Sequence, residues 1–71
     1  MTNTDLLRKK IEASGLKIVF IAEKVGISPQ AFYKKLKDGS EWTFTQVKIL
    51  KHLLNLKDDE VDEIFFTIKV E

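Results

Sequence analysis

The sequence contains no cysteine, one proline, one histidine and three glycines among its 71 residues. Without cysteine the chain has neither a disulfide framework nor a thiolate metal site, so nothing indicates an oxidising compartment. The longest uninterrupted apolar run is residues 18–22, whereas a helix that spans a bilayer needs about 20 apolar residues. Residues 1–5 lack the basic segment and apolar stretch of a signal peptide. We therefore expect a cytoplasmic protein that makes no membrane contact.

The composition is typical of one compact domain with a small core. Hydrophobic residues make up 44% and charged residues 32% of the chain, a balance that favours folding over disorder. A chain of this length buries only about 60% of the surface that its unfolded form exposes. We expect a single domain over residues 1–71, without a pocket for a large cofactor.

The charge is divided unevenly along the chain. Residues 1–51 carry ten lysine and arginine side chains against five carboxylates, a net +5, while residues 52–71 carry a net −4. This asymmetry favours a basic working face and an acidic back or tail, although ordinary solvated charge is the alternative.

The spacing of apolar residues predicts an all-α chain of five helices with no internal repeat. The first spans about residues 5–14 and the second about 17–25, and glycines at 15 and 26 end them. The third begins at Ser28-Pro29, a side-chain cap followed by a residue with a helical φ, and runs to about residue 37. Asp38-Gly39 is its predicted stop.

The fourth and fifth helices are predicted from a capping pattern and from acidic residues. Thr43 and Gln46 have the spacing of a capping box, which predicts a helix start. The apolar spacing then assigns to the buried face of the fourth helix Phe44, Val47, Leu50 and Leu54. A weakly capped acidic helix is expected over residues 58–65, with its buried face formed by Val61, Ile64 and Phe65.

Residues 67–71 alternate apolar and polar side chains and are β-branched at three of five positions, which is typical of a strand. A lone strand needs a partner. This tail either pairs with the same strand of a second chain or frays.

The second and third helices are separated by a very short turn that contains a glycine. This order is typical of a helix-turn-helix, here over about residues 17–37, whose second helix enters the DNA major groove. The residue types fit close helix packing: Ala22 is small where the helices cross, and Gly26 accepts a strained backbone. The space between the helices is expected to be filled by Ile21, Val25, Ile27 and Phe32.

The stretch over residues 21–28, Ile-Ala-Glu-Lys-Val-Gly-Ile-Ser, resembles the helix-turn-helix of the lambda repressor-like family, also called the XRE/Cro family. The resemblance covers about residues 5–65, and residues 32–39 resemble the end of the family's recognition helix with its closing glycine. It implies a compact five-helix DNA-binding domain. The short chain is similar to the small phage regulators of that family.

The resemblance also implies which side chains contact DNA. The family reads bases with the outward side of the first two turns of the third helix, which here carries Ser28, Gln30, Ala31, Tyr33 and Lys34. Gln30 suits an adenine edge, Lys34 suits guanine, and Ala31 suits a thymine methyl group. The alternative for the lysines is an ordinary solvated face.

Phosphate contacts in this family come from the start of the second helix and from the loop before the fourth. The matching positions are Lys17, Ser40, Trp42 and Thr43, and Lys37 is a further expected contact to the DNA backbone. Trp42 has two equal interpretations, because it either contacts the sugar-phosphate chain or covers the core beneath the loop.

The chain departs from the family pattern at the start of the second helix. The family often has a polar residue there that contacts a phosphate, whereas this chain has Ile18, Val19 and Phe20. Three successive apolar side chains cannot all face inward on a helix, so Val19 or Phe20 should be partly exposed unless covered. The cover is either a thicker core or, within one chain or across a dimer, the apolar tail formed by Phe65, Phe66, Ile68 and Val70. The family also has an inward-facing apolar residue near the end of the recognition helix. In this chain that position holds Lys35, and the next residue, Leu36, faces inward instead.

Catalysis has little support in the sequence, and we predict that the protein is not an enzyme. His52, the only histidine, falls on the outer face of the fourth helix. The carboxylates at residues 58–63 lack the spaced ligands and turn glycine of a calcium loop. We expect no metal and no cofactor.

Taken together, these features predict a sequence-specific regulator of transcription that binds double-stranded DNA as a homodimer at a palindromic operator. The alternative is a protein-interaction module on the same fold, antirepressor-like or antitoxin-like, without specific DNA binding. Val19, Phe20 and the tail favour the alternative, whereas Gln30, Tyr33 and Lys34 favour DNA.

Overall fold

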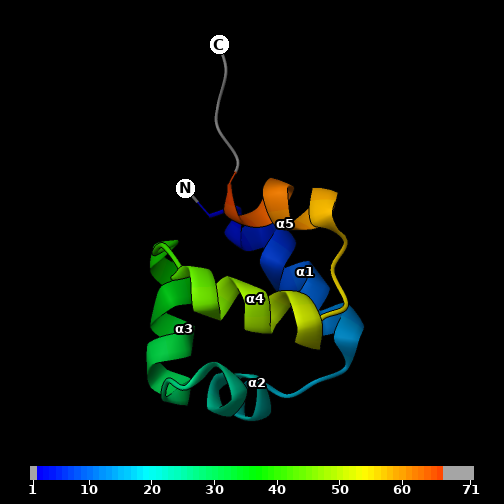
Figure 1. Ribbon diagram of the computed structural model, residues 1–71. Coiled ribbons are helices and arrows are strands. Elements are labelled where there is room, and N and C mark those ends of the chain that lie inside the picture. Colours follow the sequence, from blue (N-terminus) through cyan, green and yellow to red (C-terminus); the bar gives the residue numbers. More distant parts are fainter. Residues whose placement is uncertain (1, 67–71) are drawn as a thin grey trace.

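The computed structural model describes residues 2–66, which form five α-helices and no strand (Figure 1). The helices are α1 (Thr4–Ser14), α2 (Ile18–Val25), α3 (Pro29–Asp38), α4 (Phe44–Leu53) and α5 (Asp58–Phe65). The all-α class and the five helices are therefore confirmed. The bounds predicted for the first, second, third and fifth helices and the start predicted for the fourth lie within one residue of these bounds. The strand or frayed end predicted for residues 67–71 falls outside the described residues.

Local capping explains where the helices begin and end. The Asn3 side chain accepts the Leu6 N–H at the start of α1. At α4 the capping box is complete, because Thr43 Oγ1 accepts the Gln46 N–H and Gln46 Oε1 accepts the Thr43 N–H. Each partner satisfies a backbone donor that the first helical turn leaves unpaired.

The helices pack in a ring, and each of them contacts two others. In Figure 1 α5 lies at the top and α2 at the bottom, and α4 crosses between them. α4 packs against both α2 and α5, and α1 packs against α3 and α5. The N-terminal residues are held as well: the Asn3 N–H donates to the Ile64 carbonyl at 2.6 Å, and Thr2 Oγ1 donates to the Ser40 carbonyl at 3.3 Å.

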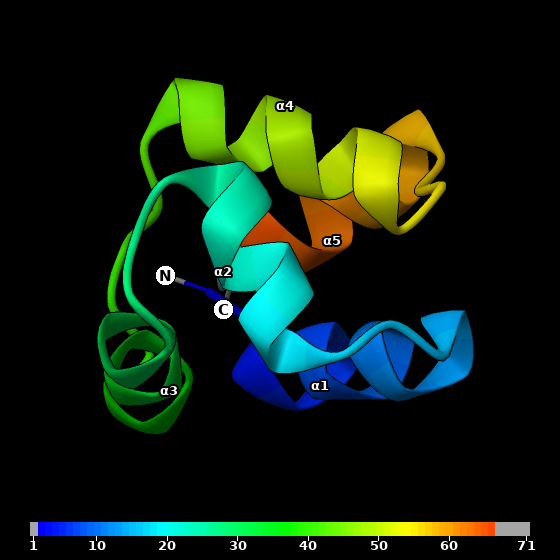
Figure 2. The same ribbon diagram turned by 90° about the horizontal axis from the view of Figure 1, so that it is seen from below.

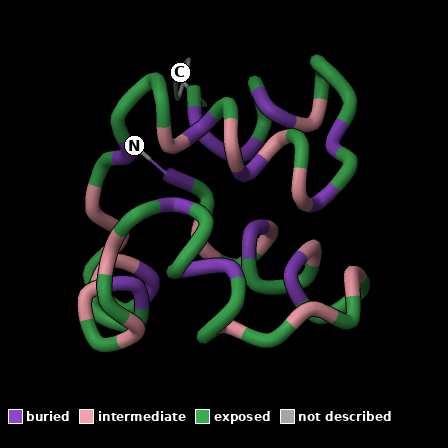
Figure 3. The backbone as a smooth tube through the Cα atoms, turned by 60° about the horizontal axis from the view of Figure 1, so that its bottom comes forward, coloured by how far each residue is buried: buried purple, intermediate pink, exposed green. Residues whose placement is uncertain are grey.

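The core takes one fully buried large side chain from each helix. In chain order these are Leu7, Ile21, Phe32, Leu50 and Ile64. In Figure 3 the buried parts of the helices face the interior and the exposed parts face outward. The burial predicted for Val61, Ile64 and Phe65 on α5 is confirmed. Because all five helices share one core, the domain cannot lose one helix without uncovering the others.

The prediction that Phe44 lies in the core is wrong, because this residue is 73% exposed. The apolar spacing assigns it to the face of Val47 and Leu50, which are buried as expected. Phe44 is the first residue of α4, however, and residues 43–45 at this end of the helix are all exposed. Its ring carries the Lys48 ammonium 5.6 Å from the ring centroid.

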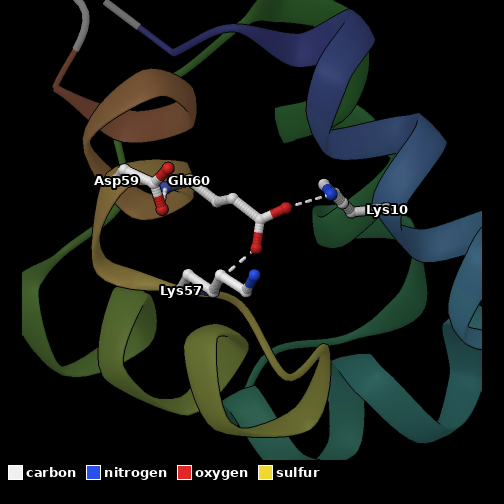
Figure 4. Close-up of polar contacts among 4 residues, drawn as sticks. All are labelled: Lys10, Lys57, Asp59 and Glu60. Atoms are coloured by element: carbon white, nitrogen blue, oxygen red, sulfur yellow. Dashed lines mark hydrogen bonds and ion pairs between the residues drawn. The ribbon is translucent and has the colours of Figure 1, made fainter.

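Ion pairs join α5 to its neighbours. Glu60 pairs with Lys10 of α1, and its carboxylate also accepts the backbone N–H of Lys57 at 2.8 Å (Figure 4). Asp58 pairs with Lys51 of α4. These hydrogen bonds and the adjacent ammonium groups lower the pKa of both carboxyl groups, with the lysine hydrogen bond as the largest cause in each. Among the described residues no helix has the length and apolar content needed to cross a membrane.

Candidate nucleic-acid interface

The connection between α2 and α3 is short and closely fixed by backbone hydrogen bonds. Gly26 has a φ of +92°, a left-handed conformation that glycine adopts without a Cβ clash. The Ala22 carbonyl accepts N–H groups from Gly26 at 2.9 Å and from Ile27 at 3.0 Å. Ala22 itself is fully buried, as its small size predicts where two helices approach closely.

The first turn of α3 is fixed by Ser28 and Pro29. Ser28 Oγ accepts the Ala31 N–H at 3.1 Å, and Pro29 occupies the first helical position. Seen from below, α3 points toward the viewer while α2 runs across the view, so the two helices lie steeply to each other (Figure 2). The start of α3 is therefore fixed by the hydrogen bond to its own backbone and by its position beside α2.

The inner side of α3 is apolar and deeply buried. Phe32 is fully buried, Leu36 is buried as expected, and the Phe32 ring lies 5.1 Å from the Trp42 ring between centroids. Of the packing set predicted between α2 and α3, Ile21, Val25 and Phe32 are buried and Ile27 is partly buried. This packing fixes the rotation of α3 about its axis, so the structure determines which side chains face solvent.

The outer side of α3 brings together the five residues predicted to read bases. Ser28, Gln30, Tyr33 and Lys34 are exposed and Ala31 is half-buried. The amide of Gln30 can donate and accept at once, which suits a bidentate pair with an adenine edge, and the Lys34 ammonium suits guanine O6 and N7. The Ser28 hydroxyl oxygen already accepts a backbone N–H, so it retains its own proton for donation.

Four of the five residues predicted to contact phosphate are exposed or half-buried. Lys17 is exposed immediately before α2, and Lys37 is exposed in the last turn of α3. Thr43 is exposed at the start of α4, where its backbone N–H donates to Gln46. Ser40 is half-buried, and its carbonyl accepts the Thr2 hydroxyl. The exposed ammonium groups of Lys17 and Lys37 lie at ends of α2 and α3.

For Trp42 the structure decides between the two interpretations in favour of the core. The side chain is buried beneath the loop against Phe32, and the Lys35 ammonium lies 5.0 Å from the centroid of its ring. Its Nε1 is buried without a hydrogen-bond partner, so this conformation offers no donor to a phosphate. Lys35, which sequence reasoning treated only as a local variant, closes the loop by donating to the Glu41 carbonyl at 2.7 Å.

The first turn of α2 exposes two apolar side chains, as the run of three apolar residues predicts, whereas the exposed Glu23 and Lys24 lie one turn later. Val19 is 61% and Phe20 41% exposed, and the Lys24 ammonium lies 5.4 Å from the centroid of the Phe20 ring. The thicker core considered as one explanation is therefore wrong. Phe65 is buried in the core, and α5 lies on the opposite side of the domain from α2 (Figure 1). Phe66 is 52% exposed directly after α5, and the remaining two tail residues, 68 and 70, lie outside the described part.

Sequence reasoning missed a groove between α4 and α5. The groove has a volume of about 630 Å³, and Phe44 and Phe66 lie on its lining with much of their surface exposed. The only signal in the sequence is the position of two aromatic residues at the outer ends of their helices. Periodicity does not separate such residues from core residues.

The described residues contain no group of three or more histidine or carboxylate side chains placed to hold a metal ion. His52 is exposed on α4, which confirms its prediction as a surface residue. Comparisons with protein-family models, with curated proteins and with solved structures found no match for this chain.

Proposed function

We propose that this protein is a transcriptional regulator of the phage or prophage type that binds double-stranded DNA in a sequence-specific manner. In this proposal α2 and α3 form a helix-turn-helix, α3 enters the major groove, and two copies occupy a palindromic operator to block or redirect polymerase. The observation that carries the proposal is the outer face of α3, where Gln30, Tyr33 and Lys34 are exposed on a helix whose inner face is fixed.

Base recognition requires side chains that keep their positions while they meet DNA. The packing of Phe32 against Trp42 and the cap at Ser28 supply that rigidity to α3. Gln30 and Lys34 are four residues apart and therefore lie one turn apart on the same side of the helix. A helix fits the width of the major groove, where lysine pairs with guanine and glutamine with adenine.

A dimer follows from how little one recognition helix reads. A single α3 contacts only a few base pairs, and two copies related by a two-fold axis would read half-sites about 34 Å apart. Lys17 and Lys37 are the basic side chains proposed to contact the phosphates beside each half-site, with Ser40 and Thr43 as polar contacts.

Selection of bound duplexes from a random DNA pool at near-physiological salt tests the proposal. The wild-type protein is expected to enrich a palindromic sequence, and Gln30→Ala is expected to enrich a sequence relaxed at one position in each half. No enrichment by a protein whose helical circular dichroism and cooperative unfolding are intact would reject specific DNA binding.

The exposed apolar face of α2 supports a second candidate, a protein-interaction module on the same fold. Val19 and Phe20 are exposed at positions where the lambda repressor-like family often has polar side chains. Salt separates the two candidates, because binding through several phosphates weakens steeply as salt rises and apolar association does not. An antirepressor-like or antitoxin-like protein would show salt-tolerant binding to a protein and no preference among DNA sequences.

A further inference from the structure

The loop between α3 and α4, residues 39–43, carries two of the residues proposed to contact phosphate. These are Ser40 and Thr43, and two further residues separate them, so their relative position depends on the backbone of the loop. Uncharged side chains hold a phosphate only through hydrogen bonds, which need donors at a suitable distance and angle. A contact that fixes the loop therefore controls both of these residues.

Lys35 of α3 contacts this loop through both its backbone and its side chain. Its carbonyl accepts the N–H groups of Gly39 at 3.0 Å and of Ser40 at 3.3 Å. Its ammonium donates to the Glu41 carbonyl at 2.7 Å and lies 5.0 Å from the centroid of the Trp42 ring. Any residue at position 35 supplies the carbonyl, whereas the two ammonium contacts require a long cationic side chain.

The conformation of the loop depends on such contacts because it buries a polar group without a partner. Trp42 is 9% exposed, and within the described part of the chain its Nε1 has no hydrogen-bond partner. A buried N–H that loses water and gains no acceptor is unfavourable. The Phe32 ring, whose centroid lies 5.1 Å from that of Trp42, and the Lys35 ammonium are contacts that offset this cost.

The same contacts hold the Lys35 ammonium within the protein. α3 contains three lysines, and of these Lys34 and Lys37 are exposed, whereas Lys35 is half-buried. Lysines that neutralise phosphates release condensed counterions and make DNA binding dependent on salt. An ammonium that is held against the loop does not contribute to this release. The three lysines therefore differ in role, although they lie within four residues of one another.

We propose that Lys35 is a positioning residue for DNA binding, which fixes the α3–α4 loop so that Ser40 and Thr43 meet phosphates and does not itself contact DNA. This inference rests on the proposed function, because the phosphates belong to the DNA that α3 reads. Arginine meets the same requirements, since its guanidinium donates hydrogen bonds and stacks on aromatic rings. Methionine keeps a long side chain that suits a helix but lacks the charge and the donors.

The position of the loop is measured without DNA. Trp42 is the only tryptophan of the chain, so its fluorescence reports on this loop. Lys35→Met is expected to increase the quenching of Trp42 by acrylamide and to move the amide signals of Glu41 and Thr43, whereas Lys35→Arg keeps the wild-type values. Lys9→Met, which removes an exposed lysine of α1, is the matched control. Quenching and amide signals that stay at wild-type values in Lys35→Met would overturn the proposal.

Affinity and salt dependence then separate positioning from direct contact. Lys35→Met is expected to bind the selected operator and scrambled duplexes about tenfold more weakly, the loss expected for about two hydrogen bonds to phosphate. Its affinity should depend on salt as that of the wild type does, whereas Lys17→Met should reduce this dependence by about one phosphate contact. Lys35→Arg should recover the wild-type affinity.

Two results of these titrations would overturn the proposal. A reduced salt dependence for Lys35→Met would make Lys35 itself a phosphate contact, and an unchanged affinity in a less stable protein would make its role structural only. Thermal unfolding of each variant confirms that folded proteins are compared. A wild type that binds no DNA would instead reject the proposed function and with it the phosphate contacts of the loop, while Trp42 quenching still decides whether Lys35 fixes the loop.

Discussion

The helix pairs α2–α3 and α4–α5 share one core but use their charged residues differently. α2 and α3 are joined by three residues and held by apolar packing, and Lys34 and Lys37 extend into solvent. α5 also buries apolar side chains in the core, and its carboxylates in addition form ion pairs, Asp58 with Lys51 of α4 and Glu60 with Lys10 of α1. Lysines that extend into solvent from a rigid helix can meet a polyanion, whereas lysines paired with carboxylates stabilise the domain. This difference is consistent with the proposal that α2–α3 meets DNA while α4–α5 stabilises the domain.

The core is the feature that the two pairs have in common, and Phe32→Ala is the largest expected disturbance of it. Phe32 is fully buried and packs on Trp42, so its removal is expected to cost about 3–5 kcal/mol of unfolding free energy. Ile64→Ala makes a matched cavity on α5 and is expected to cost about 2–5 kcal/mol. Urea unfolding followed by circular dichroism measures both.

Tyr33→Ala, one residue along α3 but exposed, serves as the control and should stay within about 0.5 kcal/mol of wild type. A cost for Ile64→Ala far below that for Phe32→Ala would mean that α5 is not an integral part of the core. α5 would then be a helix appended to a domain formed by the other helices.

The sequence predicted features that depend on nearby residues better than features that depend on the packing of distant helices. Ser28, Thr43 and Gly39 act on backbone groups within four residues, so their capping roles were correctly predicted from spacing alone. Phe44 and Trp42 depend on where neighbouring helices stop covering them. Periodicity assigned Phe44 to the core and left Trp42 undecided, because neither a helical period nor a residue type records the edge of the packed region. The exposed face of α3 was predictable because Phe32 and Leu36 fix the opposite face.

The largest effect on binding is expected from the outer face of α3. Gln30→Ala and Lys34→Ala should each cost about 1–3 kcal/mol in affinity for the selected operator and relax the preference at one base pair. Lys57→Ala removes a positive charge before α5 and is expected to leave the preference unchanged. Fluorescence anisotropy with operator and scrambled duplexes measures all three variants.

Lys17→Ala separates base contacts from phosphate contacts. It should weaken operator and scrambled DNA alike and reduce the salt dependence of binding by about one phosphate contact. Equal losses on both duplexes for Gln30→Ala and Lys34→Ala would place these side chains on the phosphate backbone and reject the assignment of α3 to base reading.

A smaller effect is expected at the ends of α2 and α4, where the two pairs make different turns. Gly26 follows α2 with a φ of +92°, and Asn55 lies just beyond α4 with a φ of +54°. Gly26→Ala should destabilise the fold by about 1–2 kcal/mol, because a Cβ is strained in the left-handed region. Asn55→Gly should change stability by less than about 1 kcal/mol, since asparagine already tolerates that region and glycine makes the unfolded chain more flexible. Thermal unfolding monitors both, and equal destabilisation would show that the short turn of α2–α3 has no special requirement.

The smallest expected effect is the pH dependence that Glu60 gives to the α5 side of the domain. The hydrogen bond from Lys10, with that from the Lys57 N–H, holds the pKa of Glu60 below its ordinary value of 4.5. A carboxyl group with a folded-state pKa below its unfolded pKa binds fewer protons when folded, so its stabilisation is complete above the unfolded value and is lost as the pH falls through the folded value. Glu60→Gln should therefore be less stable than wild type at neutral pH, and the difference should disappear in acid below pH 4.5. Urea unfolding at several pH values, with the exposed Glu12→Gln of α1 as the matched control, measures the difference. If the difference in unfolding free energy between Glu60→Gln and wild type persisted unchanged into acid, Glu60 would act through packing. The contrast between the ion pairs of α5 and the apolar packing of α2 and α3 would then fail.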